Sequence, residues 1–194
     1  MSERVTENLV GTKEAAALCG VRPSNFVRDW ASREDFPAPV ATLARGRVWA
    51  REAVEAYLDR QRGAVQWPPR RPLDLSPEAR HWLSIIKRRV VRQFRPERIV
   101  VFGSQARGDA TPDSDIDLLV VVKDGRDRSQ LQRSIRLALV DVAVAKDIFV
   151  TTPSYAARYG DVIGTLVEPA LHEGATIYAR LSGSLVRTVS PVER

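Results

Sequence analysis

The pattern of apolar and polar positions divides the chain into helix-like and strand-like segments. Apolar residues between 79 and 94 recur every three or four positions, which indicates a helix with one buried face. Ser76 and Pro77 precede this stripe and match the residue preferences of a helix start. The stripe consists of Ala79, Trp82, Leu83, Ile86, Val90 and Phe94. The opposite face carries Arg88, Arg92 and Arg95, which we interpret as a solvated surface; a contact for nucleic acid or an acidic partner is the alternative.

Short runs rich in β-branched residues predict three strands after this helix. The strands are expected at 99–102, 115–122 and 146–151, with helices at 129–142 and from about 161 to 172, and residues 175–179 close the domain. This alternation of strands and helices predicts an α/β (α+β) domain.

The first third of the chain predicts smaller elements. Two helices are expected at 13–19 and 24–32, with Gly20 ending the first. A hairpin follows, pairing 40–43 with 47–50, and then a helix at 51–61. The segment from Gly63 to Pro72 contains three prolines, so we expect a stiff, non-helical linker there.

Composition places the chain in the water-soluble globular class. Of its 194 residues, 44% are hydrophobic and 28% are charged. No apolar run approaches the ~20 residues that a membrane span needs, and the first residues lack a signal-peptide pattern. The single cysteine, Cys19, excludes an internal disulfide and a multi-cysteine zinc site. We therefore expect a cytoplasmic protein without a membrane partner.

The positive charge is concentrated in the middle of the chain. Residues 63–98 contain nine Lys and Arg against three Asp and Glu, a local excess equal to the net charge of +6 for the whole chain. Basic segments of this kind attract nucleic acid or acidic protein surfaces.

Candidate chemistry lies at the first two predicted strands. Gly103 ends the first strand, and Ser104 stands where a short helix can begin, a position whose free backbone amides attract anions. Asp115 and Asp117 are two residues apart, so their carboxylates point to one face of the second strand. Paired carboxylates suit Mg²⁺, and the glycine turn suits phosphate. The combination is what a nucleoside triphosphate requires.

These residues resemble the signature of the minimal nucleotidyltransferases, members of the DNA polymerase beta-like superfamily. The resemblance runs from about residue 78 to 181 and is carried by Gly103–Ser104, Ala106–Gly108 and Ser114–Leu118. It implies a mixed-sheet nucleotidyltransferase core that binds ATP with two Mg²⁺ ions. Gly103 and Ser104 would hold the β- and γ-phosphates, and Arg107 would either neutralise phosphate charge or brace the loop.

The same resemblance implies a third carboxylate on a later strand. Asp147 in the predicted strand 146–151 matches it and would complete a two-metal site with Asp115 and Asp117. Asp141 is the nearest competitor, but its helical context matches the family pattern poorly.

The N-terminal region resembles the winged helix-turn-helix of the AlpA/excisionase and MerR-like families. The matching segments are Lys13–Ala16, Leu18–Val21, Phe36–Pro39, Arg45–Trp49 and Val54–Leu58. The resemblance implies DNA binding, with Asn25 and Arg28 on the second helix near bases or phosphates, and Arg45 and Arg47 on the wing. A protein-docking domain is the alternative, since residues 1–62 are nearly neutral.

We therefore expect a winged helix-turn-helix at 1–62, a linker at 63–76, the nucleotidyltransferase domain at 77–181 and a tail at 182–194. Resemblance to antitoxin-type members implies transfer of AMP from ATP to a tyrosine of a HEPN toxin, with DNA binding for autoregulation of the operon. The alternatives are a small hydroxyl compound such as an aminoglycoside as acceptor, or a transcription regulator that only senses nucleotide. Base preference, the operator and whether the chain forms a homo-oligomer stay open.

Overall fold

A mixed four-stranded sheet forms the centre of the larger part of the molecule. The computed structural model describes residues 8–180, and its strand order here is β6-β5-β4-β7. β5 and β6 are parallel, while β4 pairs antiparallel with both β5 and β7. The strands span Arg98–Phe102 (β4), Ile116–Val121 (β5), Lys146–Thr151 (β6) and Ala175–Ala179 (β7). The three expected strands are therefore present, β7 is a strand that was not predicted, and the sheet is mixed as the resemblance implied.

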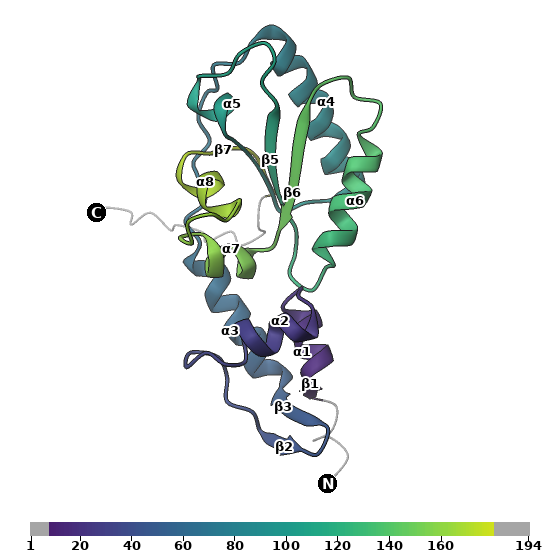
Figure 1. Cartoon of the computed structure of the whole chain (residues 1–194), viewed down its shortest axis with the longest axis vertical. Helices are drawn as coiled ribbons and strands as arrows, with labels where there is room; N and C mark the ends of the chain where they lie inside the picture. The colour runs from purple at the N-terminus through teal and green to yellow at the C-terminus, as the bar shows by residue number, and fades with distance from the viewer. Residues whose placement is uncertain (1–7, 181–194) are drawn as a thin grey trace, which may run out of the picture.

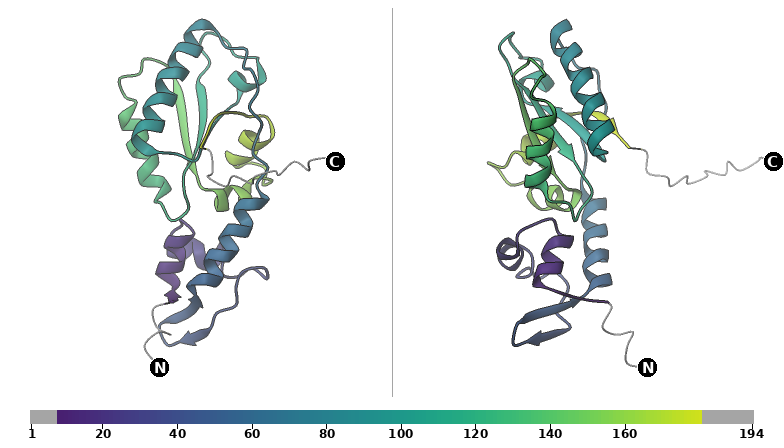
Figure 2. Two further views of the ribbon diagram at one scale, coloured as in Figure 1. Left: turned by 180° about the vertical axis from the view of Figure 1, so that it is seen from behind. Right: turned by 90° about the vertical axis from the view of Figure 1, so that its right-hand side faces the viewer.

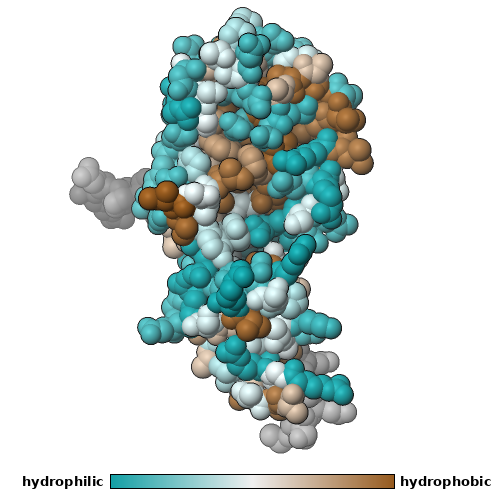
Figure 3. Space-filling view, viewed as in Figure 1, coloured by the Kyte–Doolittle hydropathy of each residue, from teal (hydrophilic) through white to brown (hydrophobic). Residues whose placement is uncertain are grey.

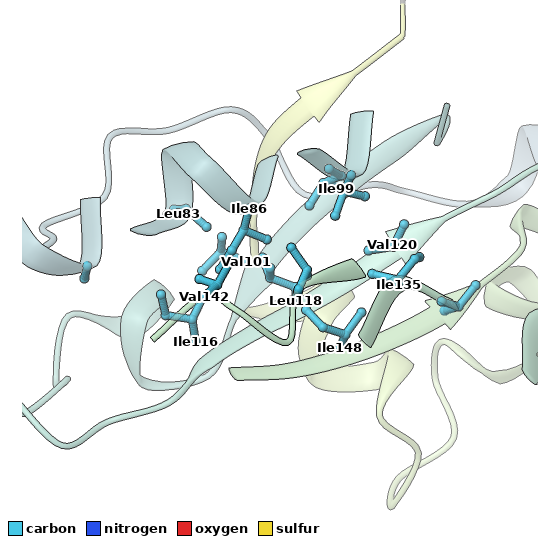
Figure 4. Close-up of a cluster of buried hydrophobic side chains, with 14 of the residues drawn as sticks. Leu83, Ile86, Ile99, Val101, Ile116, Leu118, Val120, Ile135, Val142 and Ile148 are labelled. Carbon is cyan, nitrogen blue, oxygen red and sulfur yellow. The ribbon is translucent and has the colours of Figure 1, made fainter. Parts of the chain in front are cut away.

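Helices cover the two faces of this sheet. α4 (Pro77–Phe94) and α6 (Arg128–Ala138) pack on one face, and seen from behind α4 crosses in front of the strands (Figure 2). Their apolar residues meet Ile116, Leu118 and Ile148 in the main core (Figure 4). α7 (Pro153–Tyr159) and α8 (Val167–His172) lie on the other face, against Val100, Phe102 and Leu119. Because strand side chains alternate, each strand supplies both cores.

The long helix α4 begins and ends at local sequence signals. The Ser76 hydroxyl accepts a hydrogen bond from the Ala79 amide at 3.1 Å, and Pro77 occupies the first turn. Ala79, Leu83, Ile86 and Val90 are buried, which confirms the predicted apolar stripe. Arg88, Arg92 and Arg95 are exposed, as expected for the outer face.

The N-terminal part forms a separate small unit built around a three-stranded antiparallel sheet, in the order β1-β3-β2 (Figure 1). Its elements are β1 (Leu9–Gly11), α1 (Thr12–Leu18), α2 (Pro23–Asp29), β2 (Ala41–Leu43), β3 (Gly46–Ala50) and α3 (Arg51–Ala64). Phe26, Phe36 and Trp49 pack edge to face in its core. The predicted helices and hairpin are present, but β1 was not expected because three residues are too short to show a strand pattern.

The segment after α3 is packed against the core rather than free. α3 continues to Ala64, three residues beyond the predicted end, and residues 65–76 are extended. The Thr176 amide donates to the Pro69 carbonyl at 3.0 Å, and the Arg98 guanidinium lies 5.4 Å from the centre of the Trp67 ring. The predicted linker therefore runs along the edge strand β7.

Other helix predictions also differ from the structure: α2 ends at Asp29 rather than at 32, and α8 begins at Val167 rather than at about 161. α6 ends at Ala138 instead of 142, although Leu139 and Val142 remain buried in the turn that follows. α7 was not predicted, yet Thr152 caps it and Pro153 occupies its first turn, the same signal that opens α4. The predicted tail at 182–194 lies outside the described residues. Within the described range, the structure contains no helix that is both long and apolar enough to span a membrane.

Candidate active site

The turn between β4 and α5 (Ser104–Arg107) requires glycine at its first position. Gly103 has φ of 68° and ψ of −152°, a conformation that L side chains rarely adopt. A Cβ placed on Gly103 would lie 2.3 Å from Oδ2 of Asp117. The missing side chain thus lets the Asp117 carboxylate lie directly against the turn that the sequence predicted to hold phosphate.

Strand register brings two of the three predicted carboxylates together. Asp117 on β5 is the direct register partner of Asp147 on the parallel strand β6. On its other side, Asp117 pairs with Phe102 of β4, immediately before Gly103. Both aspartates share the sheet face of Leu119 and Phe149, the face that α7 and α8 cover only in part. Asp115 is exposed and directly precedes β5.

The pKa of the Asp117 carboxyl is affected by burial and by the other two predicted carboxylates. Partial burial raises the pKa of the Asp117 carboxyl above its ordinary value, and the negative charges of Asp147 and Asp115 raise it further. Arg107 opposes this shift. The charges of Asp147 and Asp115 therefore make the Asp117 carboxyl harder to ionise unless a cation is present.

The structure separates Asp147 from its competitor, Asp141. Asp141 follows α6 and forms an ion pair with Arg89 of α4. In this pair, Arg89 Nη2 donates to Asp141 Oδ2 at 3.1 Å. α4 packs on the sheet face opposite to that of Asp117. Asp147 instead lies beside Asp117, with Arg136 Nη2 at 4.0 Å from its Oδ1.

Arg107 is held by two acidic residues at the end of α5. Its Nε lies 3.2 Å from Oδ2 of Asp109, and its Nη1 donates to Oε1 of Glu173 at 2.8 Å. Arg71 reaches the same place from the linker, donating to the carbonyls of Ala106 and Glu173, both at 2.8 Å. These contacts support the bracing role for Arg107. Sequence reasoning missed Arg71 and Glu173, because both are distant from the turn along the chain.

The donor chemistry of this acidic group suits a hard divalent cation. Carboxylate oxygens are preferred ligands of Mg²⁺, and the raised pKa of Asp117 shows a repulsion that bound positive charge would relieve. In residues 8–180, however, no set of three or more His, Cys, Asp or Glu side chains is close enough together to form a metal cluster. The carboxylates of Asp115, Asp117 and Asp147 suit Mg²⁺ by their chemistry, and the register of β5 and β6 places Asp117 beside Asp147.

The four residues predicted to contact DNA lie in different surroundings. Asn25 is half-buried and, with exposed Arg28, lines a cavity whose other wall is α7. Arg28 Nε also pairs with Oδ1 of Asp29 at 2.7 Å. Arg45 is exposed on the hairpin, whereas Arg47 donates to the Ala31 carbonyl at 3.3 Å. The face of α2 that carries Asn25 and Arg28 is therefore directed toward α7 of the core domain.

Residues 83–171 match the family model of the nucleotidyltransferase domain. The matched segment contains Gly103, Asp115, Asp117 and Asp147, and the match supports nucleotidyl transfer as the activity of this domain. The mixed sheet described above is consistent with a nucleotidyltransferase fold.

Among solved structures, a candidate nucleotidyltransferase from Sulfolobus solfataricus is similar to this chain. The two are 23% identical, the match covers 52% of this chain and 79% of that one, and the TM-score is 0.36. No curated protein matches the chain.

Proposed function

We propose that the nucleotidyltransferase domain transfers AMP from ATP to a hydroxyl acceptor and depends on Mg²⁺. The observation that carries this proposal is the register pairing of Asp117 with Asp147, beside a turn where only glycine fits. Asp115, Asp117 and Asp147 would hold two Mg²⁺ ions. When bound, the metal would neutralise triphosphate charge and lower the pKa of the acceptor hydroxyl.

The chain's own residues position the triphosphate. The turn at Gly103 and Ser104 presents backbone amides to the β- and γ-phosphates, and Arg107, braced by Asp109 and Glu173, maintains that turn. The acceptor oxygen attacks the α-phosphate and pyrophosphate leaves. Charge stabilisation and positioning are the protein's contributions to this reaction.

The proposed acceptor is a tyrosine of a HEPN toxin, which would make the chain an antitoxin. This step rests on resemblance to antitoxin-type members of the family. The N-terminal unit is then proposed as a winged helix-turn-helix that represses the operon. Its order of two helices, hairpin and helix supports that role. In a mobility-shift assay, the full chain should prefer its own promoter to a random duplex, and affinity should fall as salt rises; equal binding would favour a docking domain.

A paired glycine experiment tests the catalytic proposal. Transfer from α-labelled ATP to the purified toxin is measured for the wild type, Gly103→Ala and Gly108→Ala. Both glycines have positive φ, 68° and 87°, but a Cβ at Gly108 would meet no atom within 4 Å. Both variants should be destabilised by about 1–3 kcal/mol of backbone strain.

Only Gly103→Ala should also displace the Asp117 carboxylate and reduce transfer, by about 10²-fold or more. Equal transfer by the two folded variants would contradict the proposed site. If the wild type labels no toxin in Mg²⁺ but labels a small hydroxyl compound, the acceptor assignment is wrong and the site assignment stands.

A further inference from the structure

An open crevice lies where the N-terminal unit meets the core domain, between α1–α2 and the loop that joins β5 to α6 (Figure 1). Its volume is about 570 Å³, within the range of roughly 300–1,000 Å³ that small-molecule sites occupy. Arg22 and Asn25 line one wall, and Arg126, Arg128 and Arg133 line the other. The surface where the two parts meet is mainly hydrophilic (Figure 3).

A second cavity continues this crevice toward α7. The two share Val21, Asn25 and Arg128, and the second adds Arg28 and Arg158 to the lining. The Nε atom of Arg158 is buried and has no hydrogen-bond partner in the described part of the chain. A buried donor left without a partner costs free energy, so this atom is a point where a bound acceptor would be stabilised.

The lining of the joined cavities has a strong excess of positive charge. Six arginines line it, against two acidic residues, Asp29 and Asp127. Both acids are already engaged: Asp29 pairs with Arg28, and Asp127 accepts a hydrogen bond from the Gln130 amide at 2.9 Å. Arg22 and Arg133 are exposed, and their guanidinium groups make no hydrogen bond or ion pair to other residues within 8–180. Unneutralised guanidinium groups on facing walls favour an anionic ligand.

Two of the arginines are fixed in place by contacts within the core domain, and one of the two also contacts the N-terminal unit. The Arg128 guanidinium lies 3.6 Å from the centre of the Tyr155 ring, and its Nε is 3.5 Å from the Gly20 carbonyl oxygen. Arg126 Nη1 donates to the Phe94 carbonyl at 3.0 Å. Fixed donors lose little conformational entropy on binding, which favours a specific site over diffuse attraction.

We propose that this crevice is a second ligand site, which binds a free nucleotide or a similar small molecule carrying two or more phosphate groups. Arginine binds phosphate through two parallel N–H···O bonds, and two facing walls can engage a chain of phosphates. The volume accommodates a nucleotide. Duplex DNA is read by elements that project into its grooves, so a recessed crevice suits it poorly.

The crevice is distinct from the candidate active site. Asp117 lies near the start of β5 and the crevice-lining loop follows the end of that strand. Four residues of β5 follow Asp117. At ~3.3 Å per residue, these four residues and the loop separate Asp117 from the crevice by roughly 15–20 Å. A ligand in the crevice would bridge the two parts of the molecule. If the proposed DNA binding is correct, that ligand would hold the face of α2 that carries Asn25 and Arg28 against the core.

Calorimetry on the full chain in chelator tests this site without the metal-dependent reaction. Inorganic tripolyphosphate and ADP are titrated into the wild type and the double variant Arg22→Ala/Arg133→Ala. The wild type should bind both probes, with affinity falling as salt rises. The double variant should bind about tenfold more weakly or worse, since each tenfold step corresponds to about 1.4 kcal/mol. Arg22 and Arg133 are exposed, so the fold should persist.

Two variants outside the crevice serve as controls. Arg88→Ala removes the same charge from the exposed face of α4, and Asp117→Asn alters the carboxylate group; both should bind the probes like the wild type. The proposal is overturned if the wild type binds neither probe at millimolar concentration, or if the double variant binds as tightly. Binding of a single-stranded oligonucleotide without binding of either probe would overturn the assignment to a free nucleotide. None of these outcomes depends on transfer activity, so the proposed reaction can fail independently.

Discussion

The two ends of the parallel pair β5 and β6 carry opposite charges. At the start of the strands, Asp117 and Asp147 lie side by side in register, with Asp115 nearby. Beyond the other end, the loop after β5 and the helix after β6 contribute Arg126, Arg128 and Arg158 to the crevice. The acidic end is built within one domain, whereas the basic end becomes a cavity only because α1 and α2 pack over it.

The two ends differ in how closely their geometry is tied to chain order. Parallel pairing of two adjacent strands is sufficient to bring Asp117 beside Asp147. The crevice depends on contacts between separate parts of the chain, among them the electrostatic interaction between the Tyr159 hydroxyl and the Asp29 carboxylate. We therefore expect substitutions at the acidic end to affect chemistry, and those at the junction to affect the coupling of the two parts.

The largest expected effect is at Asp147. Asp147→Ala should retain much of the Mg·ATP affinity and lose transfer by about 10²-fold or more, because the second metal acts on the acceptor. Asp141→Ala is the matched control: its exposed pair with Arg89 should contribute little to stability and nothing to transfer. Transfer from α-labelled ATP measures the difference. Loss in Asp141→Ala with wild-type transfer in Asp147→Ala would reverse the assignment.

A smaller effect is expected at the junction. Burial, followed by the charge of Asp29, raises the pKa of Tyr159 to about 12, so the hydroxyl stays protonated at neutral pH and interacts favourably with the Asp29 carboxylate. Tyr159→Phe removes this hydroxyl and should weaken the junction by at most about 1 kcal/mol. If α2 must separate from α7 before it binds DNA, Tyr159→Phe should bind the promoter up to roughly fivefold more tightly than the wild type.

Tyr178→Phe, on β7 away from the junction, is the control for this experiment. Denaturant unfolding and fluorescence anisotropy with a labelled promoter duplex give the two measurements. Tighter DNA binding by Tyr178→Phe, or unchanged stability in Tyr159→Phe, would argue against a junction that restrains α2.

The smallest effect is the pH dependence of stability set by Asp117. Because its folded-state pKa is raised, the wild type loses stability as pH rises through that pKa, and the loss is absent below the ordinary aspartate pKa. In chelator, Asp117→Asn should therefore melt at a higher temperature than the wild type at neutral pH. The difference should shrink toward zero on acidification. Asp113→Asn, in the exposed loop before β5, is the control and should show no such trend.

Local sequence signals were sufficient for most of the core domain. The Ser76–Pro77 start and the apolar stripe predicted α4, and β-branched runs predicted three of the four strands of the sheet, β4, β5 and β6. Prediction was weakest where the sequence signals were short. α7 was not predicted despite its Thr152–Pro153 start, and α6 ends at Ala138, earlier than the predicted 142. A three-residue strand such as β1 is stabilised by its partner β3, and its own sequence carries no detectable pattern.

The sequence by itself determined the glycine turn, the spacing of Asp115 and Asp117, and the strand that carries Asp147, because these depend on short-range backbone geometry. Tertiary structure alone decided that Asp147 is the direct register partner of Asp117, that Arg71 and Glu173 support the turn, and that arginines from two parts of the chain line one crevice. Such contacts arise from the packing of elements distant in the chain, and no periodicity within one segment encodes which residues will meet.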